Sequence, residues 1–397
     1  MTEYLEEKEL FAQLPLGAQK VGTDWLNTVP NARPWIYGTM VMKGTVGILG
    51  DPGGTGKSAF ALSIALSVAT GRDLLGEHDG PLRQRNVLVI SNEDDENECR
   101  LRIQALCQAH SIKGADLEGR FYLVPGYSIR VAETAGLFTN NTVNQTAAVS
   151  ELSSLIREQE IELITFDPFV SLHGCDENNN GSMEKVMDVI RGIARAQGCG
   201  VLCLHHTGKA GDLSDPDNAL GGATAVKDAA RAVAVLARMT RKEAEELLIE
   251  DTERIRYIRM VDGKKNYSLP GAKARWFCMS SVKIDTLDED GKPYEEWVGA
   301  PIKSDLDEDE RKEMGAVAVM EAIFPILLKT GKSEIPTSSV SKDIKAALRL
   351  EDDASKYRRT MNRLPKEKPG PKIKHGGDWV KIWVVKGQPS CYHWRYC

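Results

Sequence analysis

Short apolar runs alternate with amphipathic helical patterns from Thr45 to about Met279. The apolar runs have the length of buried strands: TVGILG, NVLVIS, FYLVPG, IELITF and CGVLCLHH. Helical patterns follow the first four: from Lys57, over DENECRLRIQALCQAH, over AAVSELSSLIREQE and over Ser182–Gln197. Continuous apolar strands separated by helices are typical of βαβ units with right-handed crossovers. The pattern therefore predicts an α/β fold, with a mainly parallel sheet and helices on both faces.

The pattern changes after Gly222. RAVAVLARM, RIRYIRMV and ARWFCMS follow one another closely, with no long crossover between them. Closely spaced strand patterns favour antiparallel pairing. We expect these three runs to form an antiparallel extension of the sheet.

The C-terminal part has a different organisation. The acidic stretch SDLDEDERKE precedes a helical pattern over Met314–Lys329 and two short ones, SSVSKDIKAALRL and DDASKYRRTMNRL. KIKHGGDWVKIWVV then predicts two strands around Gly376-Gly377. Helices followed by a hairpin are the layout of a winged-helix module. We expect an N-terminal segment (1–34), a large α/β core (35–300), an acidic linker (301–313) and a small basic C-terminal domain (314–397) with the winged-helix layout.

Charge is distributed unevenly along the 397 residues. The chain has a net charge of −6, yet Ala354–Cys397 contains 11 Lys and Arg against two acids, a balance of +9. A basic end on an acidic body favours contact with a polyanion, although a merely solvated surface has the same composition.

Membrane and secreted classes are disfavoured. The longest apolar helical pattern, Ala59–Thr70, is shorter than the roughly 18 residues that a bilayer requires, and the N-terminus MTEYLEEKEL is acidic. The eight scattered cysteines are typical of reduced core thiols, so we expect a cytoplasmic protein. CYHWRYC lacks a second ligand pair for a metal, and we expect an edge strand there.

A glycine-rich run, GDPGGTGKS, lies between the first strand and its helix. Gly53, Gly54, Thr55, Gly56, Lys57 and Ser58 match the end of a phosphate-binding loop, whose amides and Lys bind phosphates and whose hydroxyl binds Mg²⁺. The position of the first glycine in the usual pattern is taken by Asp51, and the nearest glycine, Gly50, comes one residue earlier. A plain turn is the alternative, but it leaves Lys-Ser at a helix start unexplained.

Polar residues at three strand ends could complete the site, because ligands of parallel sheets bind beyond the carboxyl ends of the strands. Asp167 suits a nucleotide-bound Mg²⁺, with a turn or cap as the alternative. Glu93 could activate the attacking water, although most of residues 93–98 are acidic and could be a solvated helix start. His205 and His206 could contact the γ-phosphate or be structural.

In this order, GDPGGTGKS, VLVISNEDD, LITFDP, VLCLHHTGK and ALGGATAVKDAARAV resemble the RecA-like ATPases, specifically the plasmid RepA-type branch of the RepA/DnaB helicase superfamily. The resemblance covers Trp35 to Met279. It implies ATP and Mg²⁺ as ligands, with Lys57 and Ser58 as phosphate and metal contacts, Glu93 as general base, Asp167 as Walker B acid and His206 as γ-phosphate sensor. It also implies that Arg231 is an arginine finger acting on a neighbouring subunit's nucleotide, and that Lys264 or Lys265 points toward the nucleotide.

The family's channel segments correspond to SLHGCDENNNGSMEK and TGKAGDLSDPDNALGG, which contain few cations apart from Lys185 and Lys209. The resemblance implies a ring, typically a hexamer, that hydrolyses ATP and moves on single-stranded DNA. The charge of the basic end makes duplex DNA a possible further partner. A nucleotide-switched DNA-binding or regulatory ATPase without unwinding activity is the alternative. A small-molecule phosphotransferase is disfavoured, because no paired Arg residues accompany the loop.

Overall fold

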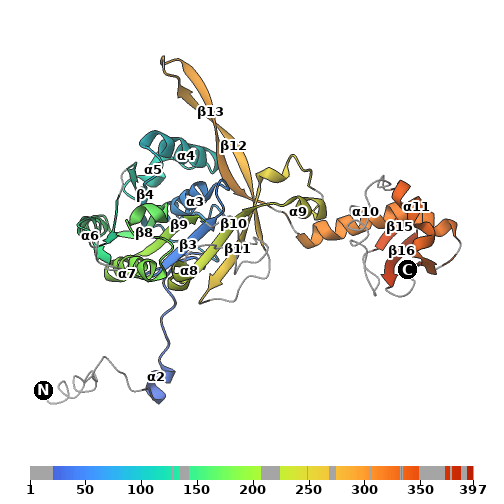
Figure 1. The fold of residues 1–397 in the computed structure, drawn as a ribbon, viewed down its shortest axis with the longest axis horizontal. Helices are drawn as coiled ribbons and strands as arrows, with labels where there is room; N and C mark the ends of the chain where they lie inside the picture. The colour runs from blue at the N-terminus through green and yellow to red at the C-terminus, as the bar shows by residue number, and fades with distance from the viewer. Residues whose placement is uncertain are drawn as a thin grey trace. The chain divides into compact units, whose positions relative to one another are not determined.

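The computed structural model describes residues 21–126, 129–134, 143–206, 224–247, 249–267, 274–304, 306, 308–330, 332, 334–347, 372–375, 378–385 and 391–396. The chain divides into two compact units, Met1–Trp35 and Ile36–Cys397. In the described part of the first unit there is one helix, α2 (Thr23–Asn27). All other elements in Figure 1 belong to the second unit, apart from the first residue of β1.

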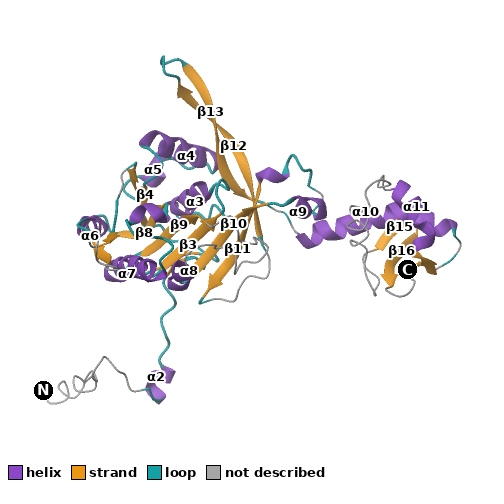
Figure 2. Cartoon of the chain, in the orientation of Figure 1, coloured by secondary structure: helices purple, strands orange, loops and turns teal. Residues whose placement is uncertain are grey.

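A nine-stranded sheet forms the centre of the second unit, in the order β13-β12-β11-β10-β3-β9-β8-β4-β5 (Figure 2). The strands are β3 (Val46–Asp51), β4 (Asn86–Ser91), β5 (Phe121–Pro125), β8 (Ile161–Asp167), β9 (Gly200–His206), β10 (Ala232–Arg238), β11 (Tyr257–Lys265), β12 (Arg275–Leu287) and β13 (Pro293–Lys303). The six strands from β10 to β5 run parallel, and β11, β12 and β13 are antiparallel.

This topology confirms the predicted α/β fold with an antiparallel extension. It also corrects one detail. β10, the strand of RAVAVLARM, pairs parallel with β3, so the extension begins only at β11. The carboxyl end of β10 therefore lies at the same edge of the sheet as the glycine-rich loop that follows β3.

Successive residues of the parallel strands contribute to two separate cores, because side chains alternate between the faces of a strand. One core contains Leu49, Val89 and Leu204 and packs against α3 (Lys57–Thr70) and α4 (Glu96–Ala109). The other contains Ile48, Ile90 and Cys203 and packs against α6 (Ala148–Glu158) and α7 (Asn180–Gln197). Burial on both faces explains why these strands are apolar throughout and why α3 is buried along nearly its whole length.

The remaining described elements of this region are short. They are β1 (Trp35–Tyr37), β2 (Val41–Met42), α5 (Gly114–Leu117), β6 (Ala132–Thr134), β7 (Val143–Gln145), the 3₁₀ helix Phe169–Leu172, α8 (Thr224–Ala229), α9 (Arg241–Glu246) and the 3₁₀ helix Arg254–Arg256. No described helix is both long enough and apolar enough to cross a membrane.

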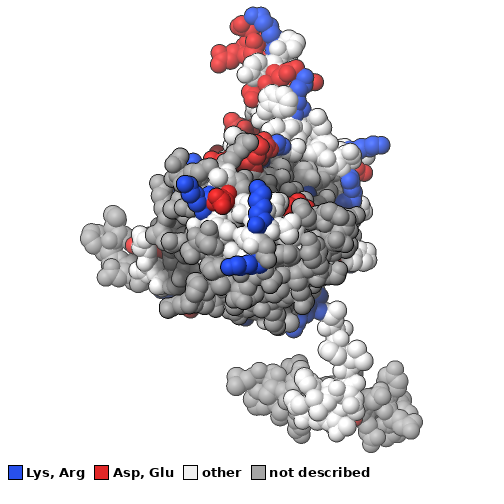
Figure 3. Space-filling model, turned by 90° about the vertical axis from the view of Figure 1, so that its right-hand side faces the viewer, with Lys and Arg blue, Asp and Glu red and all other residues white. Residues whose placement is uncertain are grey.

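β12 and β13 continue beyond the rest of the sheet as a long hairpin (Figure 1). Their pairing runs from Phe277 opposite Lys303 to Leu287 opposite Pro293. Its outer part exposes Leu287, Tyr294 and Trp297, which are 70%, 55% and 64% accessible. Acidic side chains dominate this part of the hairpin (Figure 3): Asp285, Asp288, Glu289, Asp290, Glu295 and Glu296, against Lys283 and Lys292. The hairpin tip is therefore acidic and partly apolar, which does not suit contact with a phosphate backbone.

The C-terminal region has its own hydrophobic core, which includes Val319, Phe324, Ile344 and Ile382. Its described elements are α10 (Glu308–Lys329), β14 (Glu334–Pro336), α11 (Thr337–Ala347), β15 (Lys372–His375), β16 (Asp378–Val385) and β17 (Cys391–Tyr396). The predicted hairpin is present as β15 and β16. The predicted helix over DDASKYRRTMNRL lies outside the described residues.

Two expectations for this region need correction. β17, which contains CYHWRY, is not an edge strand, because it pairs with β14 on one side and β16 on the other. The segment 301–313 is not purely a linker either, since β13 runs to Lys303 and α10 begins at Glu308. Acidic residues at a helix N-terminus are favoured by the helix dipole, which explains why an acidic run starts a helix.

Candidate nucleotide-binding site

The glycine-rich loop leads from the buried strand β3 directly into α3. Gly53, Gly54 and Gly56 have left-handed backbone conformations, with φ of 96°, 71° and 88°. Gly56 is the N-cap of α3, and among the described residues no side chain caps this helix. The first N–H groups of α3 are therefore available to an anion, and the helix dipole favours negative charge there. The loop fits a phosphate group.

Lys57 lies inside a small charged cluster at this loop. Its Nζ is 3.0 Å from Oδ1 of Asp51 and 3.1 Å from Nδ1 of His206. The side chains of Lys57 and Asp51 are only 4% and 2% accessible. Register explains the cluster, since Asp51 and His206 are paired residues of the parallel strands β3 and β9. Sequence analysis correctly predicted that Lys57 and His206 lie together.

Ser58 and Asp167 provide the oxygen atoms that Mg²⁺ prefers. Asp167 ends β8 and is 9% accessible. Burial raises the pKa of Asp167, and a hydrogen bond with Ser58 and the charge of Lys57 partly offset this effect. A buried carboxyl group beside a hydroxyl and close to Lys57 is well suited to receive a metal ion bound to phosphate.

The acids after β4 include capping and ion-paired residues, and one residue, Glu93, with no partner in the part of the chain that the structure describes. Asp95 caps α4 by accepting from the Glu98 amide at 2.8 Å. Three other acids form ion pairs: Asp94 and Glu98 both pair with Arg102, and Glu96 pairs with Arg100. Glu93 is exposed and makes no hydrogen bond or ion pair with other described residues. It lies close enough to Asp167 to raise the pKa of that group.

His205 faces a different environment from His206. Its ring packs edge-to-face on Phe169, with centroids 5.6 Å apart. Burial, together with the charges of Lys57 and His206, lowers the pKa of His205 to about 4. A neutral, packed imidazole is typical of a structural residue, whereas the ring of His206 lies within hydrogen-bond distance of Lys57 Nζ.

Arg231, Lys264 and Lys265 lie at the opposite edge of the sheet. The Arg231 amide donates to the Val46 carbonyl at the start of β3, and Lys264 and Lys265 pair with Val233 and Ala232 at the start of β10. The five residue steps of β3 separate this edge from the glycine-rich loop by about 16 Å. These cations cannot reach the glycine-rich loop of the same chain.

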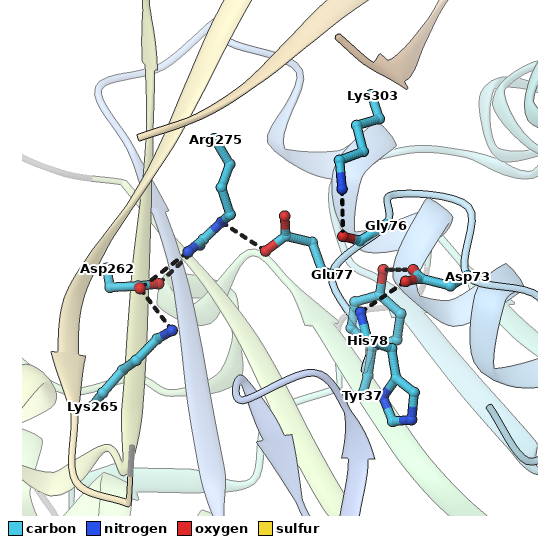
Figure 4. Close-up of polar contacts among 9 residues, drawn as sticks. All are labelled: Tyr37, Asp73, Gly76, Glu77, His78, Asp262, Lys265, Arg275 and Lys303. Atoms are coloured by element: carbon cyan, nitrogen blue, oxygen red, sulfur yellow. Dashed lines mark hydrogen bonds and ion pairs between the residues drawn. The ribbon is translucent and has the colours of Figure 1, made fainter. Parts of the chain in front are cut away.

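Arg231, Lys264 and Lys265 each contact neighbouring groups at this edge. Arg231 lies over the ring of Tyr267, 5.9 Å from its centroid. Lys264 donates to the Lys227 and Asp228 carbonyls at 3.1 and 2.8 Å. Lys265 lies 2.7 Å from Asp262, which also accepts two hydrogen bonds from Arg275 (Figure 4).

Sequence analysis missed two residues beside the loop. Arg238, the last residue of β10, donates to the Gly54 carbonyl. Met279 of β12 approaches Gly56 so closely that a Cβ there would be 3.0 Å from the Met279 methyl group. Arg238 could have been found from its strand end if β10 had been assigned to the parallel part of the sheet. Met279 comes from an antiparallel strand, and no motif indicates it.

The expected channel segments are only partly described. Lys185 is exposed on α7, and Lys209 lies outside the described residues. Residues 171–185 contain three acids and a single Lys, so this segment is not basic.

A comparison with protein families supports the nature of the site. The family profile described as an AAA domain matches residues 12–212, just over half of the chain. The match includes the glycine-rich loop, Glu93, Asp167 and His206, and it ends before Arg231. The chain therefore belongs to the AAA domain family and is a P-loop ATPase.

Proposed function

We propose that this P-loop ATPase is a ring-forming motor that acts on DNA, a replicative helicase or translocase of the RepA type, with six subunits. The main support is the division of the predicted catalytic residues between two edges of one sheet. Lys57, Glu93, Asp167 and His206 gather at one edge, and Arg231 lies about 16 Å away at the other. A neighbouring copy that presents its Arg231 edge to this loop would complete the site.

Each residue at the loop edge has a distinct role in this proposal. Lys57 and the amides at the start of α3 bind the phosphates, and Ser58 and Asp167 bind Mg²⁺. Glu93, exposed and unpaired among the described residues, accepts a proton from the attacking water. His206 contacts the terminal phosphate. Mg·ATP supplies the phosphoanhydride bond that is cleaved, and Arg231 of the neighbouring copy neutralises charge that develops as it breaks.

The choice of DNA as the partner rests on the basic end of the chain. The basic segment Ala354–Cys397, with its balance of +9, is the strongest candidate for phosphate contact. One observation favours a second function. The acidic character of residues 171–185 does not suit a DNA channel. A nucleotide-switched DNA-binding or regulatory ATPase, in which only the basic end contacts DNA, would not need a basic channel.

Mixing two inactive variants tests whether the site is shared. Lys57→Ala removes the phosphate contact, and Arg231→Ala removes the neighbour's contribution. If the finger acts between subunits, each variant alone is inactive, but a mixture regains part of the ATPase activity, because some interfaces combine an intact Lys57 with an intact Arg231. Absence of recovery in a mixture that forms mixed oligomers, as measured by native mass spectrometry, contradicts the shared site.

Single-stranded DNA separates the two functions. A motor hydrolyses ATP faster in the presence of single-stranded DNA and displaces a paired strand. A regulatory ATPase binds DNA in a nucleotide-dependent way but displaces no strand. Both measurements use the full chain with Mg·ATP.

A further inference from the structure

Asp51 is the residue by which the loop departs from the usual phosphate-binding pattern, and it lies at the centre of the site. Its carboxylate accepts hydrogen bonds from the Thr55 hydroxyl at 2.6 Å, the Thr55 amide at 3.3 Å and Lys57 Nζ at 3.0 Å. His206 Nδ1 is 3.3 Å away. Asp51 is 1% accessible. These neighbours of the carboxylate all belong to the nucleotide-binding site.

The Asp51 carboxylate binds the Lys57 ammonium group, which the phosphates of a nucleotide would also bind. Lys has three N–H donors, and in this structure Lys57 directs its Nζ toward Asp51 and His206. A phosphate oxygen would bind Nζ at about 2.8 Å, as charged acceptors do. Two anions bound to one ammonium would lie within roughly 6 Å of each other, where like charges in a buried site repel strongly.

The charge state of Asp51 is consistent with this competition. Burial alone would raise the pKa of the carboxyl group, but the hydrogen bonds from Thr55 and Lys57 and the charge of Lys57 outweigh burial and lower it. Asp51 is therefore an anion at neutral pH. It neutralises Lys57 without a nucleotide, which removes the cost of an unpaired buried ammonium.

We propose that Asp51 is an internal counter-ion that holds Lys57 in the nucleotide-free protein and competes with the phosphates of ATP, so that it sets the affinity of the site for nucleotide. Asp51 acts through Lys57 and Thr55, and it is a positioning residue. The inference depends on nucleotide binding to the loop and not on a ring or on DNA.

Asp51→Asn is the decisive variant, because the amide keeps an acceptor oxygen for Thr55 and loses the charge. Equilibrium binding of a fluorescent ATP analogue with Mg²⁺ should become at least about tenfold tighter, since like-charge repulsion is removed. The melting temperature of the nucleotide-free protein should fall, because Lys57 loses its counter-ion. A residue that only shapes the loop would lower both stability and affinity.

Two further variants complete the test. Asp51→Ala also removes the acceptor for Thr55, and it should lower the nucleotide-free melting temperature further than Asp51→Asn while still binding more tightly than the wild type. Glu162→Gln is the matched control. Glu162 also pairs with two cations, Lys43 and Arg85, but at the start of β8, away from the loop. This variant should lower the melting temperature and leave the nucleotide affinity unchanged.

An Asp51→Asn protein that binds the analogue with wild-type or weaker affinity overturns the inference, and Asp51 is then a loop-shaping residue. This failure is distinguishable from failure of the proposed motor. The motor fails if the wild-type protein binds nucleotide but shows neither DNA-stimulated hydrolysis nor shared sites, and the Asp51 result holds in either case.

Discussion

At the residue scale, Glu93 differs from its acidic neighbours by having no partner among the described residues. Glu93→Gln removes the group that we propose as the proton acceptor for the attacking water. We expect ATP turnover to fall at least about a hundredfold, the scale of general-base catalysis, with ATP binding retained. Steady-state hydrolysis and equilibrium binding measure the two effects.

Glu96→Gln is the control for this prediction. Glu96 is an exposed acid of the same run, but it pairs with Arg100 on the surface of α4. Its substitution should leave turnover within about twofold of the wild type, because exposed pairs contribute little. Unchanged hydrolysis in Glu93→Gln would remove Glu93 from the mechanism and return the whole run to a helix-start role.

The buried pair of Lys57 and Asp51 also affects folding. Lys57→Met leaves a buried carboxylate without its cation, and breaking one side of a buried pair costs about 3 kcal/mol or more. We expect urea denaturation to show a loss of this size. Adding Asp51→Asn should recover most of the loss, since the uncompensated charge is then gone. A double variant as unstable as Lys57→Met would show that the pair does not couple in this way.

The sequence predicted which side chains meet at the loop better than it predicted their individual contacts, for physical reasons. Lys57, Asp167 and His206 were predictable because each follows a continuous apolar strand, and parallel strands end at one edge. Sequence analysis chose Glu93 among the acids of residues 93–98 as the candidate base, whereas the capping role of Asp95 emerges only from its hydrogen bond with the Glu98 amide. Asp51 was treated as a defect of the loop, since motif spacing does not show which groups a buried side chain contacts.

At the scale of elements, the orientation of one strand accounts for the main topological error. β10 is followed closely by β11, and short spacing suggested that it was antiparallel to its neighbours. In fact β10 pairs with β3 in parallel. The segment that joins β9 to β10 contains α8. The consequence is chemical as well as topological, because the carboxyl end of β10 places Arg238 at the loop and its amino end places Arg231 at the opposite edge.

The network in Figure 4 ties the segment after α3 to the antiparallel strands, and it predicts a pH effect on stability. Burial raises the pKa of Glu77 from its ordinary value of 4.5 to about 7, although Arg275 and Lys303 oppose the shift. Arg275 Nε lies 2.7 Å from Glu77, but its other nitrogens bind Asp262. Glu77 therefore shares its cation with a second acid.

Between pH 4.5 and about 7 the folded protein binds more protons at Glu77 than the unfolded chain does, so stability falls as pH rises through this window. The fall is on the order of 3 kcal/mol. Glu77→Gln should remove this part of the slope in urea denaturation between pH 4.5 and about 7. The exposed Glu118→Gln should leave it unchanged. A wild-type slope in Glu77→Gln would show that another group titrates there.

At the scale of the whole molecule, the ring proposal depends on the position of the predicted catalytic residues at two opposite edges of the sheet. If Arg231 acts as we propose, the site is incomplete in a single copy, and head-to-tail association of identical copies would complete every site in a closed ring. Nucleotide occupancy would then stabilise the oligomer, because ligands that bind across an interface favour association. Native mass should therefore increase when Mg·ATP is added to wild-type protein, and less so for Arg231→Ala.

The C-terminal region provides the test of DNA contact, and the structure determines where the chain should be cut. A cut after Glu351 would remove Val380 and Ile382 from a core that begins at Val319, whereas the two cores of the sheet include no described residue beyond Ala300. Truncation after Leu306 should leave nucleotide affinity unchanged, weaken binding to single-stranded DNA and flatten its salt dependence. The slope should change by about 0.7 for each phosphate that the shortened protein no longer neutralises.

Replacing Arg358 and Arg359 by Gln in the full-length protein should also flatten the salt dependence of DNA binding. The change should be smaller than in the truncated protein, because only two of the 11 cations of the basic segment are removed. This variant keeps every described residue of the C-terminal core, so it separates loss of charge from loss of the folded region. If the truncated protein keeps the full slope, the basic end does not contact DNA, and phosphate binding must come from the sheet domain.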